Sequence, residues 1–132
     1  MARKFGFAGK SEEESVIIDM YADQLGDLSN ELAKYFKEKC GEKKKPIEEK
    51  IVKEIMPVQL KFFDDRLAKS GSGYIVPSGL TWVDLLLYVL YDWIPQNDKC
   101  FENFKHLKEH RTKVDSIPQI AKWLKIRPVT SI

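Results

Sequence analysis

Between residues 11 and 41, apolar side chains recur every three or four residues, which is the repeat of one face of an α-helix. These apolar positions are Ile18, Tyr21, Leu25, Leu28, Leu32 and Tyr35. Ser11 and Glu14 precede them with the spacing of a capping box. Gly41 follows them, where a helix commonly stops. The pattern therefore predicts a long amphipathic helix over residues 11–41.

A second helix is predicted to open at Pro46, near its first turn, where a missing backbone N–H costs little. Two neighbouring apolar rows give it a wide buried surface: Ile51, Ile55, Val58 and Phe62 form one row, and Met56, Leu60, Phe63 and Leu67 the other. Pro57 interrupts the pattern and predicts a kink that frees a carbonyl near Lys53. The Ser-Gly-Ser-Gly run at residues 70–73 ends this helix, and we expect an extended loop after it.

Nearly every side chain from residue 82 to residue 93 is apolar. A helix that is apolar all round is buried on all sides, so we expect this one at the centre of the domain. Thr81 and Asp84 have the spacing of its capping box, with Leu80 and Leu85 as the flanking hydrophobic staple. A carboxylate at that position gains backbone N–H groups and the positive end of the helix dipole. We therefore interpret Thr81 and Asp84 as structural.

Two further helices complete the pattern. Phe101, Phe104 and Leu107 mark a fourth, amphipathic helix, and a fifth begins near Pro118. The apolar side of the fifth consists of Ile120, Trp123, Leu124 and Ile126. The predicted fold class is all-α, a bundle of about five helices around one hydrophobic helix.

Composition narrows the possible partners. The chain has 132 residues, of which 43% are hydrophobic and 32% charged, as in an ordinary globular domain. A net charge of +2 gives no argument for nucleic acid, and the longest apolar run is too short to cross a membrane. The two cysteines, Cys40 and Cys100, do not make a disulfide framework. We expect reduced thiols and a cytoplasmic protein.

A zinc-peptidase pattern, H-x-x-E-H, occurs at His106 and His110. Two histidines at this spacing share one face of a helix. The neighbouring Lys105, Lys108 and Arg111 would repel a dication, and no third ligand is evident. We interpret the segment as a solvated, charged helix face and expect no metal site and no cofactor.

Asp23 and Asp27 are neighbours on one helix face, opposite the apolar stripe of the first helix. Val16 and Met20 continue that face in apolar form. The first helix is therefore predicted to have two contact faces, one toward its own core and one toward another molecule. Two interpretations of the aspartates stay open: a solvated acidic surface, or a site for a cation such as an amino group or a divalent metal.

Three segments together resemble the sigma class of cytosolic glutathione transferases, including its nematode-type enzymes. Residues 2–10 resemble the end of that family's third helix and its linker. Residues 78–84 resemble the capping box and staple of its central C-terminal helix. Ser116-Ile117-Pro118, with Trp123 and Arg127-Pro128, resembles its last helix and tail.

The resemblance implies a domain organisation. Residues 1–10 would be the linker from a thioredoxin-like domain that is missing here, and residues 11–132 the C-terminal helical domain. That family conjugates glutathione, its co-substrate, to hydrophobic electrophiles and works as a homodimer. The thioredoxin-like domain supplies the tyrosine that stabilises the glutathione thiolate. This chain alone is therefore expected to be inactive.

The resemblance also implies roles for particular residues. Asp27 aligns with an acidic residue that reaches across the dimer to the glutathione amine, and Asp23 with a neighbouring carboxylate. The pocket for the hydrophobic substrate would be lined by Leu28, Ser29, Leu90 and Ile132. Core packing is the alternative for Leu28 and Leu90. A non-catalytic interaction or structural module of the same fold, or a store for hydrophobic ligands, is the alternative for the whole chain.

Overall fold

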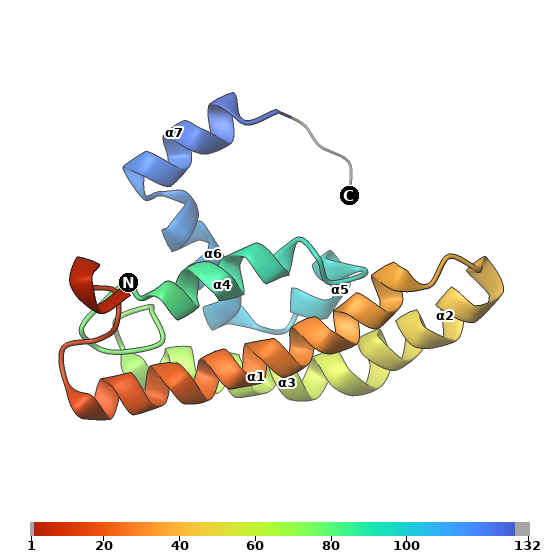
Figure 1. Ribbon diagram of the computed structural model, residues 1–132, viewed down its shortest axis with the longest axis horizontal. Coiled ribbons are helices and arrows are strands. Elements are labelled where there is room, and N and C mark those ends of the chain that lie inside the picture. Colours follow the sequence, from red (N-terminus) through yellow and green to blue (C-terminus); the bar gives the residue numbers. More distant parts are fainter. Residues whose placement is uncertain (1, 129–132) are drawn as a thin grey trace.

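The computed structural model describes residues 2–128, and within them every regular element is helical apart from one isolated bridge between Val76 and Gly79. In chain order, the elements are η1 (Ala2–Phe5), α1 (Glu12–Lys37), α2 (Gly41–Lys50), η2 (Ile51–Ile55), α3 (Met56–Ser70), α4 (Trp82–Tyr91), α5 (Asn97–Phe101), α6 (Lys105–Asp115) and α7 (Pro118–Ile126). The long helices α1 and α3 run antiparallel, and α4 and α6 pack with them (Figure 1). The predicted all-α fold is confirmed.

Helix α1 begins at its predicted cap, where the Glu14 amide donates to Ser11 Oγ at 3.1 Å. Five of the six predicted stripe residues are buried, and Tyr35 is half-buried. The predicted end at Gly41 is wrong. The helix stops at Lys37 because Glu38 adopts an extended backbone and its carboxylate accepts the Cys40 amide at 2.8 Å. Gly41 begins α2 instead.

The two prolines of the second helical segment compare differently with the prediction. Pro46 lies inside α2 rather than at its start. Pro57 lies, as predicted, inside a helical run, which continues without a break from Gly41 to Ser70. The kink expected there takes the form of a π-helical turn, η2, in which the Met56 amide donates to the Ile51 carbonyl five residues back.

The π turn also decides which apolar row of α3 is buried. Met56, Leu60, Phe63 and Leu67 lie in the core, as predicted. In the other row, Ile51 is buried and Ile55 is half-buried against the core, but Val58 is 68% exposed. The prediction of burial was therefore wrong for Val58 and Phe62, because one extra residue in the turn rotates the later positions outward.

Helix α4 packs on α1 and α6, with Val83, Leu87, Leu90 and Tyr91 buried. The predicted burial on all sides is not observed, because Val89 is exposed, as is Trp93 in the turn that follows the helix. Within residues 2–128, one side of this apolar helix is therefore exposed to solvent.

The fourth helix begins later than its apolar pattern suggested, whereas the fifth, α7, begins at Pro118 as predicted. Phe101 belongs to the short helix α5, and Phe104 only precedes α6. Since Phe104 offers no capping side chain, Asp64 of α3 accepts the Leu107 amide at 2.9 Å in the first turn of α6. Helix α7 stands away from the rest of the bundle (Figure 1) and leaves Trp123 and Ile126 exposed.

Two acidic side chains join segments that are distant in the sequence. The Glu14 carboxylate accepts the Lys10 amide at 2.7 Å and the Ser78 amide at 2.9 Å, which ties the N-terminal segment to the loop before α4. The buried Asp84 carboxylate accepts the amides of Ile75 and Thr81, each at 2.8 Å, within the capping box of α4. The Thr81 hydroxyl also donates to it, at 2.6 Å.

We predict that Glu14→Ala removes hydrogen-exchange protection from the Ser78 amide and lowers the unfolding free energy by about 1 kcal/mol, as loss of a cap does. Glu13→Ala, an exposed residue of the same turn, is the control and should change neither. The hydrogen bond from the Lys10 amide is the main cause that lowers the pKa of Glu14 below its ordinary value of 4.5. This contribution is therefore present above the unfolded-state pKa, and it disappears as the pH falls through the lowered value. Ser78 protection that persists in Glu14→Ala would contradict the assigned bond.

We predict that Asp84→Asn lowers the unfolding free energy by roughly 3 kcal/mol or more, because the new amide turns N–H donors toward backbone donors in a buried site. Asp92→Asn is the matched control, since Asp92 forms a half-exposed ion pair with Arg111 and should cost at most about 1 kcal/mol. Urea denaturation midpoints measure both. Equal midpoints for the two variants would show that Asp84 is not the structural cap described.

Candidate functional site

The outer face of α1 carries the acidic pair singled out by the sequence. Asp23 and Asp27 are both exposed, one helical turn apart, on the side opposite the buried stripe. Val16 and Met20, also exposed, precede them along the helix. A surface with adjacent carboxylates and apolar side chains can bind a cation that carries, or sits beside, an apolar group.

Helix α3 extends this surface. The Tyr21 and Phe62 rings stack at 4.6 Å between centroids, and Gln24 Nε2 donates to Gln59 Oε1 at 2.7 Å. These contacts bring two antiparallel helices together, so the exposed residues of each continue one surface. We call this surface the α1–α3 outer face, formed by Val16, Met20, Asp23 and Asp27 of α1 with Val58 and Phe62 of α3.

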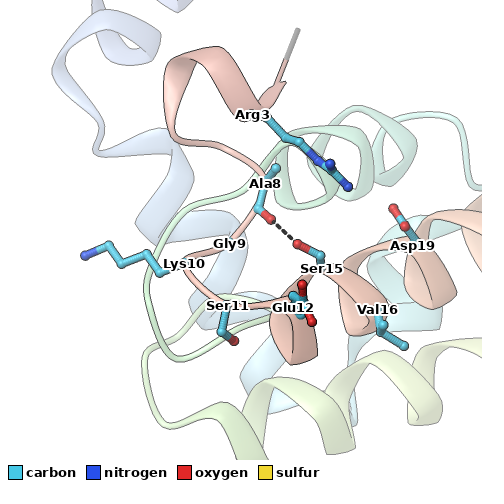
Figure 2. Close-up of a pocket in the computed structure, with 9 residues that line it drawn as sticks. All are labelled: Arg3, Ala8, Gly9, Lys10, Ser11, Glu12, Ser15, Val16 and Asp19. Atoms are coloured by element: carbon cyan, nitrogen blue, oxygen red, sulfur yellow. Dashed lines mark hydrogen bonds between the residues drawn. The ribbon is translucent and has the colours of Figure 1, made fainter.

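A cavity of about 590 Å³ lies at the N-terminal end of the same helix (Figure 2). Its lining comes from the segment before α1 and from the first turns of α1: Arg3, Ala8, Gly9, Lys10, Ser11, Glu12, Ser15, Val16 and Asp19. Ser15 Oγ donates to the Ala8 carbonyl at 3.1 Å and holds the two walls together. In Figure 2, Arg3 and Asp19 point toward the same opening, which therefore offers both signs of charge. No pattern in the sequence indicated this cavity, because it depends on how residues 2–10 fold back.

Two of the residues predicted to line the hydrophobic substrate pocket are buried in this chain. Leu28 and Leu90 are each only 2% exposed and pack in the core, which is the alternative that the sequence left open. Ser29 is half-buried on α1. Ile132 lies outside the described residues. A role for these four side chains in substrate binding stays a prediction.

The histidines of the H-x-x-E-H pattern do not share a solvated face, so that prediction was wrong for His110. His106 is partly exposed, with Nδ1 3.0 Å from Asp64 Oδ2, whereas His110 is 1% exposed. His110 follows Leu107 by three residues and precedes Val114 by four, and all three are buried against the bundle. This spacing was the available signal that His110 faces the core.

Metal and thiol chemistry find no support in residues 2–128. No three histidine, cysteine, aspartate or glutamate side chains gather there as a metal site would require. Cys40 and Cys100 are both free. Burial raises the pKa of the Cys100 thiol, which opposes formation of a reactive thiolate. Over the same residues, no helix has the length and hydrophobicity needed to cross a bilayer.

Known proteins resemble this chain in sequence. Residues 26–127 match the protein family described as glutathione S-transferase, C-terminal domain. Probable glutathione S-transferase 9 of Caenorhabditis elegans is 33% identical over 99% of this chain and 66% of its own length. Probable glutathione S-transferase 7 of the same nematode is 37% identical over 98% of this chain and 65% of its own length.

Solved structures agree with these sequences. The prostaglandin synthase D of Nilaparvata lugens has a TM-score of 0.87 and 28% identity, over 98% of this chain and 65% of its own. A monomeric glutathione S-transferase of the hookworm Necator americanus has a TM-score of 0.86 and 29% identity, over 99% of this chain and 66% of its own. This chain spans about two thirds of the length of each relative. It belongs to the family of glutathione S-transferase C-terminal domains.

Proposed function

We propose that this chain is the hydrophobic-substrate-binding and dimerisation half of a glutathione transferase, which conjugates glutathione to electrophiles when a thioredoxin-like domain is present. The observation that supports this most directly is the α1–α3 outer face, on a chain that belongs to this family. Its two aspartates are free to meet a ligand or partner, since both are exposed and neither serves as a helix cap.

The proposed ligand of Asp27 is the amino group of glutathione bound to a second subunit, with Asp23 adding negative charge one turn away. An ammonium group and a carboxylate form a charge-assisted hydrogen bond, which is stronger than a neutral one. Neighbouring like charges on a helix repel each other, and a cation placed between them would relieve that repulsion.

The α1–α3 outer face is also the proposed dimer surface. It combines apolar side chains on two helices with a carboxylate edge, and a two-fold contact would bury the apolar groups of both copies. The hookworm relative is described as monomeric.

The proposed hydrophobic substrate would lie beside Ser29, Leu28, Leu90 and Ile132, between this chain and the thioredoxin-like domain. Val89 of α4 and Trp93, in the turn after it, are exposed, which supports an apolar neighbour on that side of α4. The cytoplasm is the proposed compartment, because both cysteines are free and reduced thiols are usual there.

Asp27→Ala should raise the KM for glutathione about tenfold, the expected effect of losing one charge-assisted bond at a partly exposed site. The test uses a chimera that joins the thioredoxin-like domain of a nematode relative to this chain, assayed with an aryl halide. Asp19→Ala, an exposed aspartate on the same helix, is the control and should leave KM unchanged. An unchanged KM in the Asp27 variant would reject its assigned role. A folded chimera without turnover would favour the non-catalytic interaction module.

Met20→Glu should convert a dimer of this chain into a monomer, because it places a further negative charge in the apolar part of the α1–α3 outer face. Val89→Glu is a matched control, since Val89 is 49% exposed and Met20 50%, but Val89 lies on α4. Sedimentation equilibrium measures both variants. A monomeric wild-type chain at all concentrations tested, or a dimer that survives Met20→Glu, would overturn the proposed dimer surface.

A further inference from the structure

Behind the capping box of α4, a histidine and a tyrosine extend the buried polar network. His110 Nε2 lies 3.1 Å from Asp84 Oδ1, and His110 Nδ1 lies 2.9 Å from the Tyr91 hydroxyl. The Tyr91 hydroxyl is also 3.4 Å from the Leu107 carbonyl. All three side chains are essentially inaccessible to solvent. None of them takes part in the proposed function, and this inference does not depend on it.

The partners of the imidazole decide which nitrogen carries the proton. The Asp84 carboxylate accepts the Ile75 amide, the Thr81 amide and the Thr81 hydroxyl, so His110 Nε2 must donate to it. In the neutral ring, Nδ1 is then an acceptor, and the Tyr91 hydroxyl donates to it. Every polar group of the network has a partner in this state.

The cationic state can also be satisfied without moving a heavy atom. A protonated Nδ1 becomes a donor, so the Tyr91 oxygen would accept from it. The hydroxyl proton then needs a different acceptor, and the Leu107 carbonyl is already beside it. Rotation about the Tyr91 C–O bond is the only change required.

We propose that His110 binds a proton reversibly inside the folded core, and that the Tyr91 hydroxyl moves from His110 Nδ1 to the Leu107 carbonyl when it does. Protonation of His110 Nδ1 adds one N–H donor, and reorientation of the Tyr91 hydroxyl makes its oxygen available as the acceptor. No buried polar group is therefore left unpaired in either state. The network is thus a pH-sensitive device that joins α4 to the first turn of α6.

The charges around the imidazole are mixed. From α4, the Asp84 carboxylate favours the cation, and from the preceding loop the Tyr74 ring meets the imidazole edge-on at 6.2 Å. Arg111 of α6, 5.8 Å from the Tyr91 ring, opposes the cation, as does Lys113, which lies over Tyr74. Asp64 of α3 acts on Tyr91 in the opposite sense to Arg111.

Tyr91 itself keeps its proton throughout. Burial, and then the nearby Asp84 charge, raise its pKa well above the ordinary value. It is therefore a hydroxyl donor at every pH at which His110 changes charge, which the exchange of acceptors requires.

Side-chain ¹⁵N and ¹³C NMR of the complete 132-residue chain, titrated from pH 4 to 9, tests the proposal. His110 should titrate in the folded protein, with Nε2 protonated at high pH. In Tyr91→Phe the proton on Nδ1 has no acceptor, so the proton affinity of His110 should fall about three- to tenfold. Tyr88→Phe is the matched control, because the Tyr88 hydroxyl donates to Asp115 rather than to His110, and the midpoint should not move. His106→Gln assigns the two histidine signals.

Three results would overturn the proposal. His110 shifts that stay constant over this range would show that no proton is bound, and shifts that change only together with unfolding, followed by circular dichroism, would place protonation outside the native state. An unchanged midpoint in Tyr91→Phe would remove the hydroxyl from the mechanism. If that variant does not fold, the Tyr91 ¹³Cζ shift in the wild-type chain replaces it. The Tyr91 ¹³Cζ shift should change with the same pH midpoint as the His110 shifts. A ¹³Cζ shift that does not change at that midpoint would equally refute the exchange of acceptors.

Discussion

The buried carboxylate of Asp84 connects more of this domain than any apolar contact that the sequence pattern suggests. It accepts backbone amides from the loop after α3 and from the start of α4, and it meets the imidazole of α6. A charge held without water must have every lone pair satisfied. The loop, the beginning of α4 and the position of α6 are therefore fixed together, and the apolar side chains pack around that arrangement.

Fixing α4 in this way also determines what α1 presents to solvent. Helix α1 buries its stripe against α4 and its other neighbours, and Glu14 fastens its first turn to the loop before α4. The aspartates, on the opposite side, remain exposed. A helix with one face packed in the core and one exposed face that is acidic and partly apolar is suited to binding another molecule. The proposed function rests on this division.

The sequence predicted those features that depend on local periodicity. The helical class, the stripe of α1 and the capping boxes at Ser11 and Thr81 follow from spacing alone. The predictions were wrong where a local sequence signal competes with tertiary packing. Gly41 resembles a helix stop, yet the extended Glu38 had already ended α1. Lysine and arginine neighbours made His110 look solvated, whereas packing against α4 buries it.

Other features had no local signal at all. The cap of α6 comes from Asp64, more than forty residues earlier in the chain. The cavity beside residues 2–10 requires the N-terminal segment to fold back on α1. For the acidic face the sequence predicted exposure, but its ligand depends on a second molecule, which the spacing of residues in one chain does not specify.

The wide turn before Pro57 has a consequence for evolution by insertion and deletion. Its five-residue spacing is what separates the buried row of α3 from the row that reaches the outer face. Loss of a single amino acid between Ile51 and Ile55 would restore regular winding and leave every downstream side chain on its present face, because a π turn of five residues and an α turn of four both return the chain to the same side of the helix. Regular winding with every residue kept would instead rotate α3 by about 100° and turn Val58 and Phe62 inward. The π turn therefore lets this helix carry one surplus residue without changing which of its two apolar rows is buried.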